Sequence, residues 1–193
     1  MILIRHGESE FNVAFNRTGR DPGIPDPALT ERGRAQVRRA AAEMRQHGRP
    51  IKRLITSPFT RALETAAILA EELGLPVEVE MIVHEHACYH CDIGTPVSLL
   101  AERWPALDFS HMPEMWWPEA EARESLMQRC ADFRVKAARL GDWEHVGVVS
   151  HWGFIRGLTG HDARNAEIVP FDPTRRRAAR RRASKPSPSC SGA

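Results

Sequence analysis

The chain has 193 residues, of which 42% are hydrophobic and 27% charged, a composition typical of a single globular domain. No apolar run approaches the roughly 18 residues of a membrane-spanning helix, and no basic stretch precedes the short apolar N-terminus, so the sequence predicts neither a membrane partner nor a secretory signal. The four cysteines are scattered and lack the pattern of a disulfide framework. We therefore expect a cytoplasmic protein.

The net charge of +2 is unevenly distributed. Residues 174–193 hold six arginines, one lysine and no acidic residue, so the rest of the chain carries +2 − 7 = −5. Such a composition is typical of a disordered segment. We predict a folded domain over 1–172 and a basic, disordered tail over 173–193. The alternative is that this tail attracts nucleic acid or another acidic surface, without sequence specificity.

The first half of the domain begins with an apolar strand at residues 2–4. Residues 16–30 are rich in glycine, proline and aspartate and predict a long loop. A helix is expected next, with Thr30 as its N-cap and Gly48 as its C-terminal stop. A short strand at 53–57 follows the helix.

The second half repeats this alternation. A helix is expected with Ser57 as its cap, Pro58 in its first position and Gly74 at its end. Further along the chain, the apolar patterns predict a strand at 77–85, helices at 95–104 and 119–140, a strand at 145–151, and a segment at 152–160 directly after it. Strands that alternate with helices predict an α/β fold, with a doubly wound and mostly parallel sheet flanked by helices.

Polar residues stand at the ends of several predicted strands. His6 follows the first strand in LIRHG, and His151 follows the last in VVSHW. Glu85 ends the third strand, and Arg61 lies on the helix after the second. Ligands of open α/β sheets bind where the carboxyl ends of strands meet, so we expect these four side chains to converge on one crevice. Taken alone, each histidine is more often a packing or surface residue.

Five segments, taken in order, resemble the histidine phosphatase superfamily, also called the phosphoglycerate mutase-like family. They are RHGESEFN, LTERGRAQ, SPFTRALETA, the HEH of the third strand and SHWGFIRGLTG, and they span residues 2 to about 169. The resemblance implies a phosphomonoesterase that acts on a small phosphorylated metabolite through a phosphohistidine, with no metal or cofactor. It assigns the phosphoryl group to His6, whose imidazole, with an ordinary pKa near ~6.5, is largely neutral at pH 7. Gly7 is expected to let the backbone turn tightly beside the phosphate.

The resemblance also assigns the other residues of a phosphate pocket. Arg5, Arg61 and His151 would surround the phosphate, and a protonated His151 would add a third positive charge. Guanidinium groups suit this task because they offer paired donors with a permanent charge. Asn12 would donate a further hydrogen bond. Glu85 would protonate the leaving alkoxide and then activate water, and the nearby phosphate would raise the pKa of its carboxyl.

Two alternatives to a phosphatase remain open. A mutase would return the phosphoryl group to another hydroxyl of the same substrate, although mutases of this family tend to be longer and to carry an FxGW pattern that is missing after RHGESEFN. A binding protein could keep the fold without turnover. The sequence predicts neither the phosphate ester nor the oligomeric state.

Two further motifs allow more than one interpretation. The histidines and cysteines of HEHACYHC could bind zinc, but no second ligand pair follows at a suitable spacing, so we expect them to pack beside the acid or to line the substrate pocket. Met115, Trp116 and Trp117 could form a small lid-like insertion over the substrate, or the tryptophans could fill the core under the long helix.

Overall fold

The computed structural model describes residues 1–46 and 50–175. Its centre is a sheet of five strands, β1 (Ile2–Arg5), β2 (Arg53–Thr56), β3 (Val77–Val79), β4 (Val146–Ser150) and β5 (Ile168–Pro170). Their order is β3-β2-β4-β1-β5. Neighbouring strands among the first four are parallel, and β5 pairs antiparallel with β1 at one edge. The predicted α/β fold with a mostly parallel sheet is confirmed.

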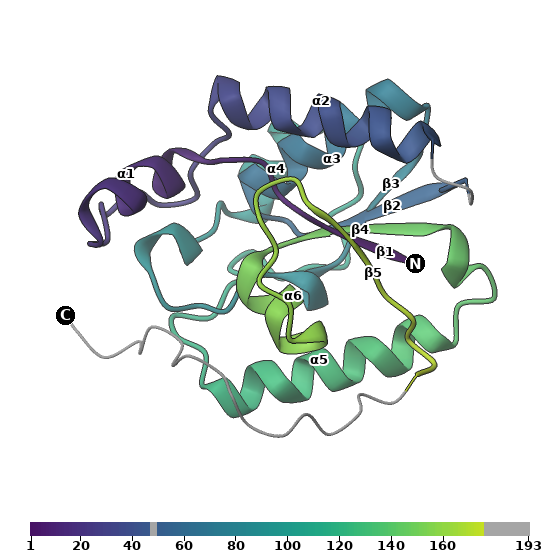
Figure 1. Ribbon diagram of the computed structural model, residues 1–193. Helices are drawn as coiled ribbons and strands as arrows, with labels where there is room; N and C mark the ends of the chain where they lie inside the picture. Colours follow the sequence, from purple (N-terminus) through teal and green to yellow (C-terminus); the bar gives the residue numbers. More distant parts are fainter. Residues whose placement is uncertain (47–49, 176–193) are drawn as a thin grey trace.

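The described residues form six α-helices around this sheet (Figure 1). They are α1 (Glu10–Thr18), α2 (Glu31–Gln46), α3 (Thr60–Leu73), α4 (Val97–Arg103), α5 (Arg123–Ala138) and α6 (Trp152–Thr159). Short 3-10 turns lie at Met81–Val83, His90–Asp92 and Trp143–His145. The α2–α3 pair covers one face of the sheet and the α5–α6 pair covers the other, as expected for a doubly wound arrangement.

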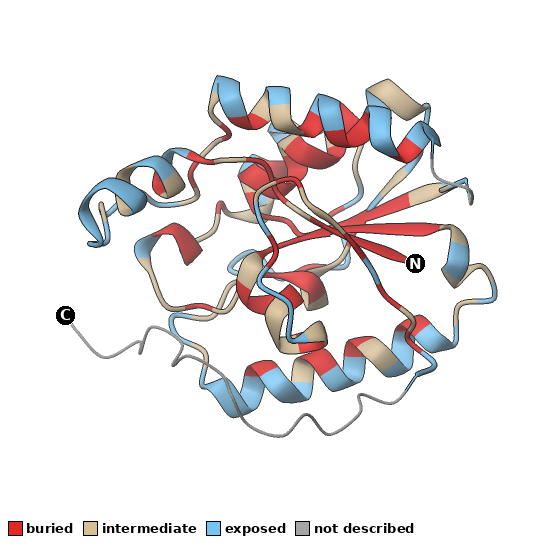
Figure 2. Ribbon diagram, in the orientation of Figure 1, coloured by how far each residue is buried: buried red, intermediate tan, exposed pale blue. Residues whose placement is uncertain are grey.

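The central strands are buried on both faces because their side chains alternate between two apolar clusters. Leu3 of β1 packs in the cluster that contains Phe133 of α5 and Phe154 of α6. The next residue, Ile4, packs on the opposite face with Val37 of α2. Figure 2 shows the result as buried strands between helices, of which α2 and α5 are buried on one side and exposed on the other.

Some predicted helix ends are confirmed and one is wrong. The Thr30 hydroxyl accepts a hydrogen bond from the Gly33 backbone at 2.9 Å, as an N-cap does. Gly74 ends α3 in the left-handed conformation, with φ 66°. The predicted start of α3 is wrong. The helix begins at Thr60, and the Ser57 hydroxyl contacts His151 instead of acting as the N-cap. Gly48 lies outside the described residues.

Helix α1 occupies part of the predicted loop. It starts with a capping box, in which Ser9 and Asn12 exchange side-chain and backbone hydrogen bonds of 3.1 and 3.4 Å. Only Phe11 of this short helix is buried, so its apolar periodicity is weak. The edge strand β5 was also not predicted, since three residues ending in proline carry little strand signal.

The predicted strand at 77–85 is too long. β3 ends at Val79, and Met81–Val83 form a 3-10 turn. Ile82 and Val83 are apolar because they pack into the core beside α5 and α6, not because they extend the sheet. Glu85 therefore lies in a loop beyond the strand rather than at its end.

Trp116 fills the core, but not under α5. It packs edge-on against Phe59, with ring centroids 4.7 Å apart, in a separate cluster that includes Leu63 of α3 and Leu100 of α4. The basic tail beyond Arg175 lies outside the described residues, so the domain boundary stays a prediction. Within residues 1–46 and 50–175, no helix is both long enough and apolar enough to cross a membrane.

Candidate active site

Strands β1 and β4 are neighbours, and each is followed directly by a histidine. The His6 backbone N–H donates to the Ser150 carbonyl at 2.9 Å, which holds the two strand ends together. The imidazole rings of His6 and His151 lie 5.1 Å apart between centroids, and both residues are buried. The structure thus brings the two histidines together at the carboxyl edge of the sheet.

The imidazole of His6 is held in one tautomer. Its Nδ1 lies 2.7 Å from the carbonyl oxygen of Gly7. A carbonyl oxygen can only accept a hydrogen bond, so Nδ1 carries the proton and Nε2 keeps its lone pair. Burial, followed by the charges of Arg61 and Arg5, lowers the pKa of His6 well below its ordinary value. His6 is therefore neutral at pH 7, with a free nucleophilic nitrogen.

Two arginines stand beside this imidazole. Arg61, on α3, is 2% exposed and donates to the Cys91 carbonyl at 2.7 Å and to Asp92 Oδ1 at 3.1 Å. Arg5, at the end of β1, donates through Nη1 to the Ala163 carbonyl at 2.9 Å. Its Nε is buried and has no hydrogen-bond partner in the described chain. An unpaired buried donor is costly, and a phosphate oxygen would give it a partner.

His151 precedes α6 and is fully buried. Its Nε2 lies 2.8 Å from the hydroxyl of Ser57, and the ring of Phe59 meets it edge-on at 5.4 Å. Burial, and then Arg61 and His6, lower the pKa of His151 well below its ordinary value. These surroundings oppose the protonation on which a third positive charge from His151 would depend. Sequence reasoning also missed Ser57 as its partner, although Ser57 directly follows β2.

Glu85 reaches the site from its loop. Its Oε1 accepts hydrogen bonds from the backbone of His86 at 2.8 Å and of Phe154, in the first turn of α6, at 3.2 Å. Burial and the neighbouring Asp92 carboxylate raise the pKa of Glu85. Gly153 makes this approach possible, since a Cβ there would lie 2.5 Å from Oε1.

Arg129 of α5 fixes the loop that carries Glu85. Its guanidinium donates to the carbonyls of Ile82 at 3.0 Å, of His84 at 2.8 Å and of Glu85 at 3.2 Å. It also forms a two-pronged ion pair with Glu121, at 2.9 and 2.6 Å. Sequence reasoning missed Arg129, because no local motif shows that α5 packs against this loop.

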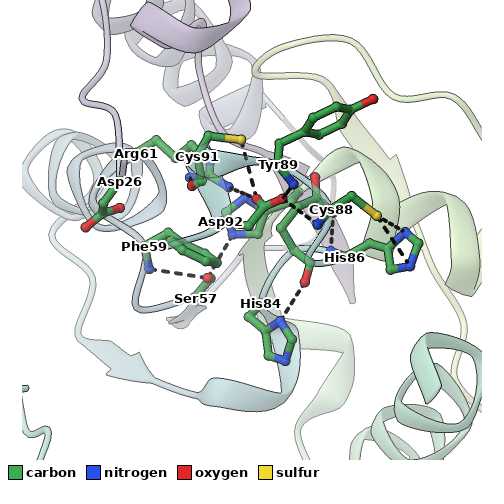
Figure 3. A network of polar contacts seen from close by, with 12 residues as sticks. Asp26, Ser57, Phe59, Arg61, His84, His86, Cys88, Tyr89, Cys91 and Asp92 are labelled. Carbon is green, nitrogen blue, oxygen red and sulfur yellow. Dashed lines mark hydrogen bonds and ion pairs between the residues drawn. The ribbon is translucent and has the colours of Figure 1, made fainter. Parts of the chain in front are cut away.

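Asp92 links Arg61 to the loop at residues 88–92 (Figure 3). Its Oδ1 pairs with Arg61, and its Oδ2 accepts the backbone N–H groups of Cys88 at 3.0 Å and of Tyr89 at 3.1 Å. This carboxylate was also missed, because only the histidines and cysteines of the motif were considered. It sets both the position of Arg61 and the course of the loop.

The histidines and cysteines of this loop have other partners. His86 donates through Nε2 to the Glu121 carbonyl at 2.9 Å, and its Nδ1 lies 3.4 Å from the sulfur of Cys88. No group of three or more potential metal ligands is arranged around a common point in the described residues. His86, Cys88 and Cys91 line the pocket beside Glu85, as the second interpretation of this motif predicts.

Asn12 and Gly7 complete the surroundings of His6. Asn12 Oδ1 accepts from the Ser9 backbone and from Asn165 Nδ2, at 3.1 and 3.0 Å, which leaves the amide NH₂ for a ligand. The backbone of Gly7 does not use the left-handed conformation open to glycine, since its φ is not positive. It is small because α2 packs against it, and a Cβ would lie 2.6 Å from the Gly33 carbonyl oxygen.

Five of the six predicted site residues line one pocket of about 430 Å³, and His151 lies against His6 without lining it. The five lining residues are Arg5, His6, Asn12, Arg61 and Glu85. A neutral imidazole nucleophile, two guanidinium groups and a buried carboxyl together have the composition of a phosphoryl-transfer site. The chain belongs to the histidine phosphatase superfamily (branch 1), which it matches over residues 1–172.

Relatives within this family include phosphatases and mutases. Phosphoserine phosphatase 1 of Hydrogenobacter thermophilus is 33% identical over 159 residues, which cover 78% of this chain and 70% of that protein. The 2,3-bisphosphoglycerate-dependent phosphoglycerate mutase of Bradyrhizobium sp. (strain BTAi1) is 37% identical over 76 residues. That match covers 39% of this chain and only 35% of the mutase.

Solved structures show the same fold. The ecdysone phosphate phosphatase of Bombix mori, in complex with tungstate, has a TM-score of 0.65 at 15% identity over 95% of this chain and 96% of that one. A mycobacterial glucosyl-3-phosphoglycerate phosphatase has a TM-score of 0.58 at 21% identity, over 87% and 88% of the two chains. At these identities the likeness extends to the fold alone.

Proposed function

We propose that the protein is a phosphomonoesterase that hydrolyses a small phosphorylated metabolite through a phosphohistidine at His6. The observation that carries this proposal is the hydrogen bond from His6 Nδ1 to the Gly7 carbonyl. It leaves the lone pair of Nε2 free in a pocket that also holds Arg5, Arg61 and Glu85. The family supplies the phosphorylated substrate class.

In the first step, His6 Nε2 attacks phosphorus, and a P–N bond forms as the bond from phosphorus to the leaving oxygen breaks. The electron pair of the broken bond stays on that oxygen, which takes a proton from the Glu85 carboxyl. Arg5 and Arg61 stabilise the negative charge on the transferring phosphoryl group. The raised pKa of Glu85 favours the protonated carboxyl that this donation requires.

In the second step, the Glu85 carboxylate takes a proton from water, and the water oxygen attacks phosphorus. The P–N bond breaks, its electron pair returns to His6 Nε2, and inorganic phosphate leaves. His6 returns to its neutral form, which the low pKa of this residue favours. Each residue then has the protonation state with which the cycle began.

A mutase is the alternative, in which the phosphoryl group returns to another hydroxyl of the substrate. The likeness to a phosphoserine phosphatase extends over 78% of the chain, whereas the likeness to the Bradyrhizobium mutase extends over 39%. The chain thus spans about a third of the length of that mutase. This difference in coverage supports a phosphatase over a mutase.

The test is to trap the phosphoenzyme. The wild type, mixed with an alkyl phosphate and quenched within milliseconds, should carry acid-labile phosphate and should release inorganic phosphate over many turnovers. His6→Ala should do neither, while His111→Ala, which changes an exposed histidine, should behave as the wild type does. Circular dichroism checks that both variants are folded. Acid-labile phosphate on His6→Ala would refute the assignment, and a rearranged phosphate ester without free phosphate would indicate the mutase.

A further inference from the structure

The pocket is larger than the phosphate group requires. Its volume of about 430 Å³ lies in the range of sites that enclose ligands of drug-like size. His6, Arg5, Asn12, Arg61 and Glu85 account for the phosphate and the proton in the proposed function. Most of the remaining lining residues come from α1, the loop at 88–92, and helices α5 and α6. Apart from Asp92 and Gly153, which help to place Arg61 and Glu85, they have no role in that chemistry.

One wall of this remaining space is aromatic. Phe11 and Phe15 lie one turn apart on α1, and their rings stack with centroids 5.3 Å apart. Tyr89 meets them from the loop at 88–92, with its ring 5.6 Å from that of Phe11 and 5.4 Å from that of Phe15. These three residues, the aromatic wall, present the faces and edges of mutually contacting rings to the pocket.

The other wall is formed by α5 and α6. Leu126 and Met127 of α5 line it together with Trp152 of α6. Met127 is 38% exposed and lines the pocket, and its flexible thioether can adapt to the shape of a ligand. Gly157 lines this wall without a side chain, because a Cβ there would be too close to the Cys130 sulfur.

The loop that carries Tyr89 of the aromatic wall is held in place by polar contacts. Asp92 accepts the Tyr89 backbone N–H at 3.1 Å while it pairs with Arg61. Asp21, in the segment after α1, accepts the His90 backbone N–H at 2.8 Å and its Nδ1 at 3.1 Å. The loop is thus tied both to the phosphate-binding arginine and to the segment that follows α1. A wall fixed in this way is formed before a ligand arrives, which lowers the entropic cost of binding.

We propose that this space receives the alcohol portion of the substrate, and that this alcohol is an aromatic or bulky apolar one rather than a small polyhydroxylated one. Its hydrocarbon would lie between the aromatic wall and Leu126, Met127 and Trp152. Asn16, Arg123 and Arg156 also line the pocket and can serve a polar substituent of the alcohol. A sugar or glycerate skeleton set between the aromatic wall and Leu126, Met127 and Trp152 would still leave hydroxyls facing rings and methyl groups, at the cost of lost hydrogen bonds to water. This inference rests on the proposed function, because it concerns the group that leaves from the phosphate.

The test compares two esters of primary alcohols, 3-phenylpropyl phosphate and glycerol 3-phosphate. We expect kcat/KM for the phenylpropyl ester to exceed that for the glycerol ester by about tenfold or more, because its ring is buried against aromatic side chains. Phe15→Ala should reduce that ratio several-fold. Val13→Ala, on the exposed side of the same helix, should leave the ratio unchanged. A ratio of one or below in the wild type, or an equal ratio in Phe15→Ala, would overturn the inference.

Binding of two phosphonates separates this inference from the proposed function. 4-Phenylbutylphosphonate and 3,4-dihydroxybutylphosphonate replace the leaving oxygen by carbon and cannot be hydrolysed. Calorimetry should show tighter binding of the phenyl compound to the wild type, and a smaller difference for Phe15→Ala. If neither ester is turned over and no phosphohistidine forms, the proposed function fails, yet the two phosphonates still decide what the pocket accepts. Equal binding of the two would overturn the inference even in an active phosphatase.

Discussion

In the proposed mechanism Glu85 and His6 need opposite protonation states, and the surroundings of each residue shift its pKa in the required direction. His6 must be neutral to attack phosphorus, and burial beside Arg61 and Arg5 lowers its pKa. Glu85 must be protonated to help the leaving group, and burial near Asp92 raises its pKa. Groups whose surroundings move their pKa values in opposite directions are what acid–base chemistry at one pH requires. The rate of His6 phosphorylation should therefore rise as His6 loses its proton and fall at higher pH as Glu85 loses its own.

Glu85→Gln keeps the size of the side chain but removes the proton. Single-turnover phosphorylation of His6 by an alkyl phosphate should fall by about 100-fold or more, because a general acid typically contributes a factor of this size. With 4-nitrophenyl phosphate, whose leaving anion is stable without a proton, the loss should be small. The decline of the alkyl rate at high pH should also disappear. Equal losses on both substrates would mean that Glu85 only positions the phosphate.

Gly153→Ala should act on the same step without changing any ionisable group. The new Cβ would lie 2.5 Å from Glu85 Oε1 and 2.9 Å from His86 Cβ, so the carboxyl must move away from the first turn of α6. We expect the same selective loss on alkyl phosphates as in Glu85→Gln, with a modest cost in stability of about 1–2 kcal/mol. Kinetics on both substrate types, with unfolding curves in urea, check this. A variant with wild-type rates on alkyl phosphates would show that the position of Glu85 tolerates this shift.

At the scale of secondary-structure elements, the site requires α2 to pack closely against the segment that follows β1. Gly33 of α2 sits against the segment that follows the nucleophile, and a Cβ on Gly33 would lie 2.1 Å from the Glu8 carbonyl oxygen. The Glu8 carbonyl in turn accepts the Thr30 backbone N–H at 2.9 Å, at the start of α2. The Glu8 carbonyl and the α2 backbone at Gly33 are both main-chain groups, so neither can rotate out of the way as a side chain could.

Gly33→Ala should therefore lower the free energy of unfolding by at least about 2 kcal/mol, because α2 must move as a body. Gly141→Ala is the matched control. Its Cβ would have no neighbour within 4 Å and its φ is not positive, so its effect should stay within about 0.5 kcal/mol. Urea unfolding of the two variants and the wild type measures the difference. A Gly33→Ala variant as stable as Gly141→Ala would show that α2 docks more loosely than the structure indicates.

At the scale of the whole molecule, local patterns in the sequence predicted the layered fold, and the family resemblance supplied most of the pocket residues. Apolar strands that end in polar residues indicated where His6 and His151 would lie, and the adjacency of β1 and β4 explains why they meet. The sequence could not predict the roles of Arg129 and Asp92. Arg129 binds backbone carbonyls of a segment distant in the chain, and Asp92 forms an ion pair with Arg61. Their roles depend on how loops pack, which no periodicity encodes.

Three buried histidines make the folded protein sensitive to acid. The pKa values of His6 and His151 are lowered on folding, and that of His84 falls from 6.5 to about 4 through burial and the nearby Arg129. A histidine with a depressed pKa contributes stability that is complete above its unfolded pKa and is lost as the pH falls toward its folded one. Glu85 acts in the opposite direction, because its raised pKa costs stability as the pH rises through the interval above 4.5.

The contribution of His84 can be measured separately. From pH 7.5 to pH 5 it should account for about 2 kcal/mol of the wild type's loss in unfolding free energy. His84→Asn keeps a donor for the Glu85 carbonyl, which His84 Nδ1 meets at 2.6 Å, but does not titrate. Its unfolding free energy should therefore fall by about 2 kcal/mol less than that of the wild type over this interval. Parallel pH dependences in urea unfolding would show that His84 is protonated equally in both states.

The packing of Gly7 against Gly33 also relates the reactivity of the nucleophile to motion of the fold. The Gly7 carbonyl that selects the His6 tautomer belongs to a residue whose backbone is in contact with α2. If α2 opens locally, Gly7 loses this support and the proton of His6 is free to move to Nε2, where it blocks attack. In the proposed mechanism, only molecules in which α2 is closed would then hold His6 in the reactive tautomer. The rate at which the α2 amides exchange with solvent deuterium would measure how often α2 opens, and so the fraction of molecules in which it is closed.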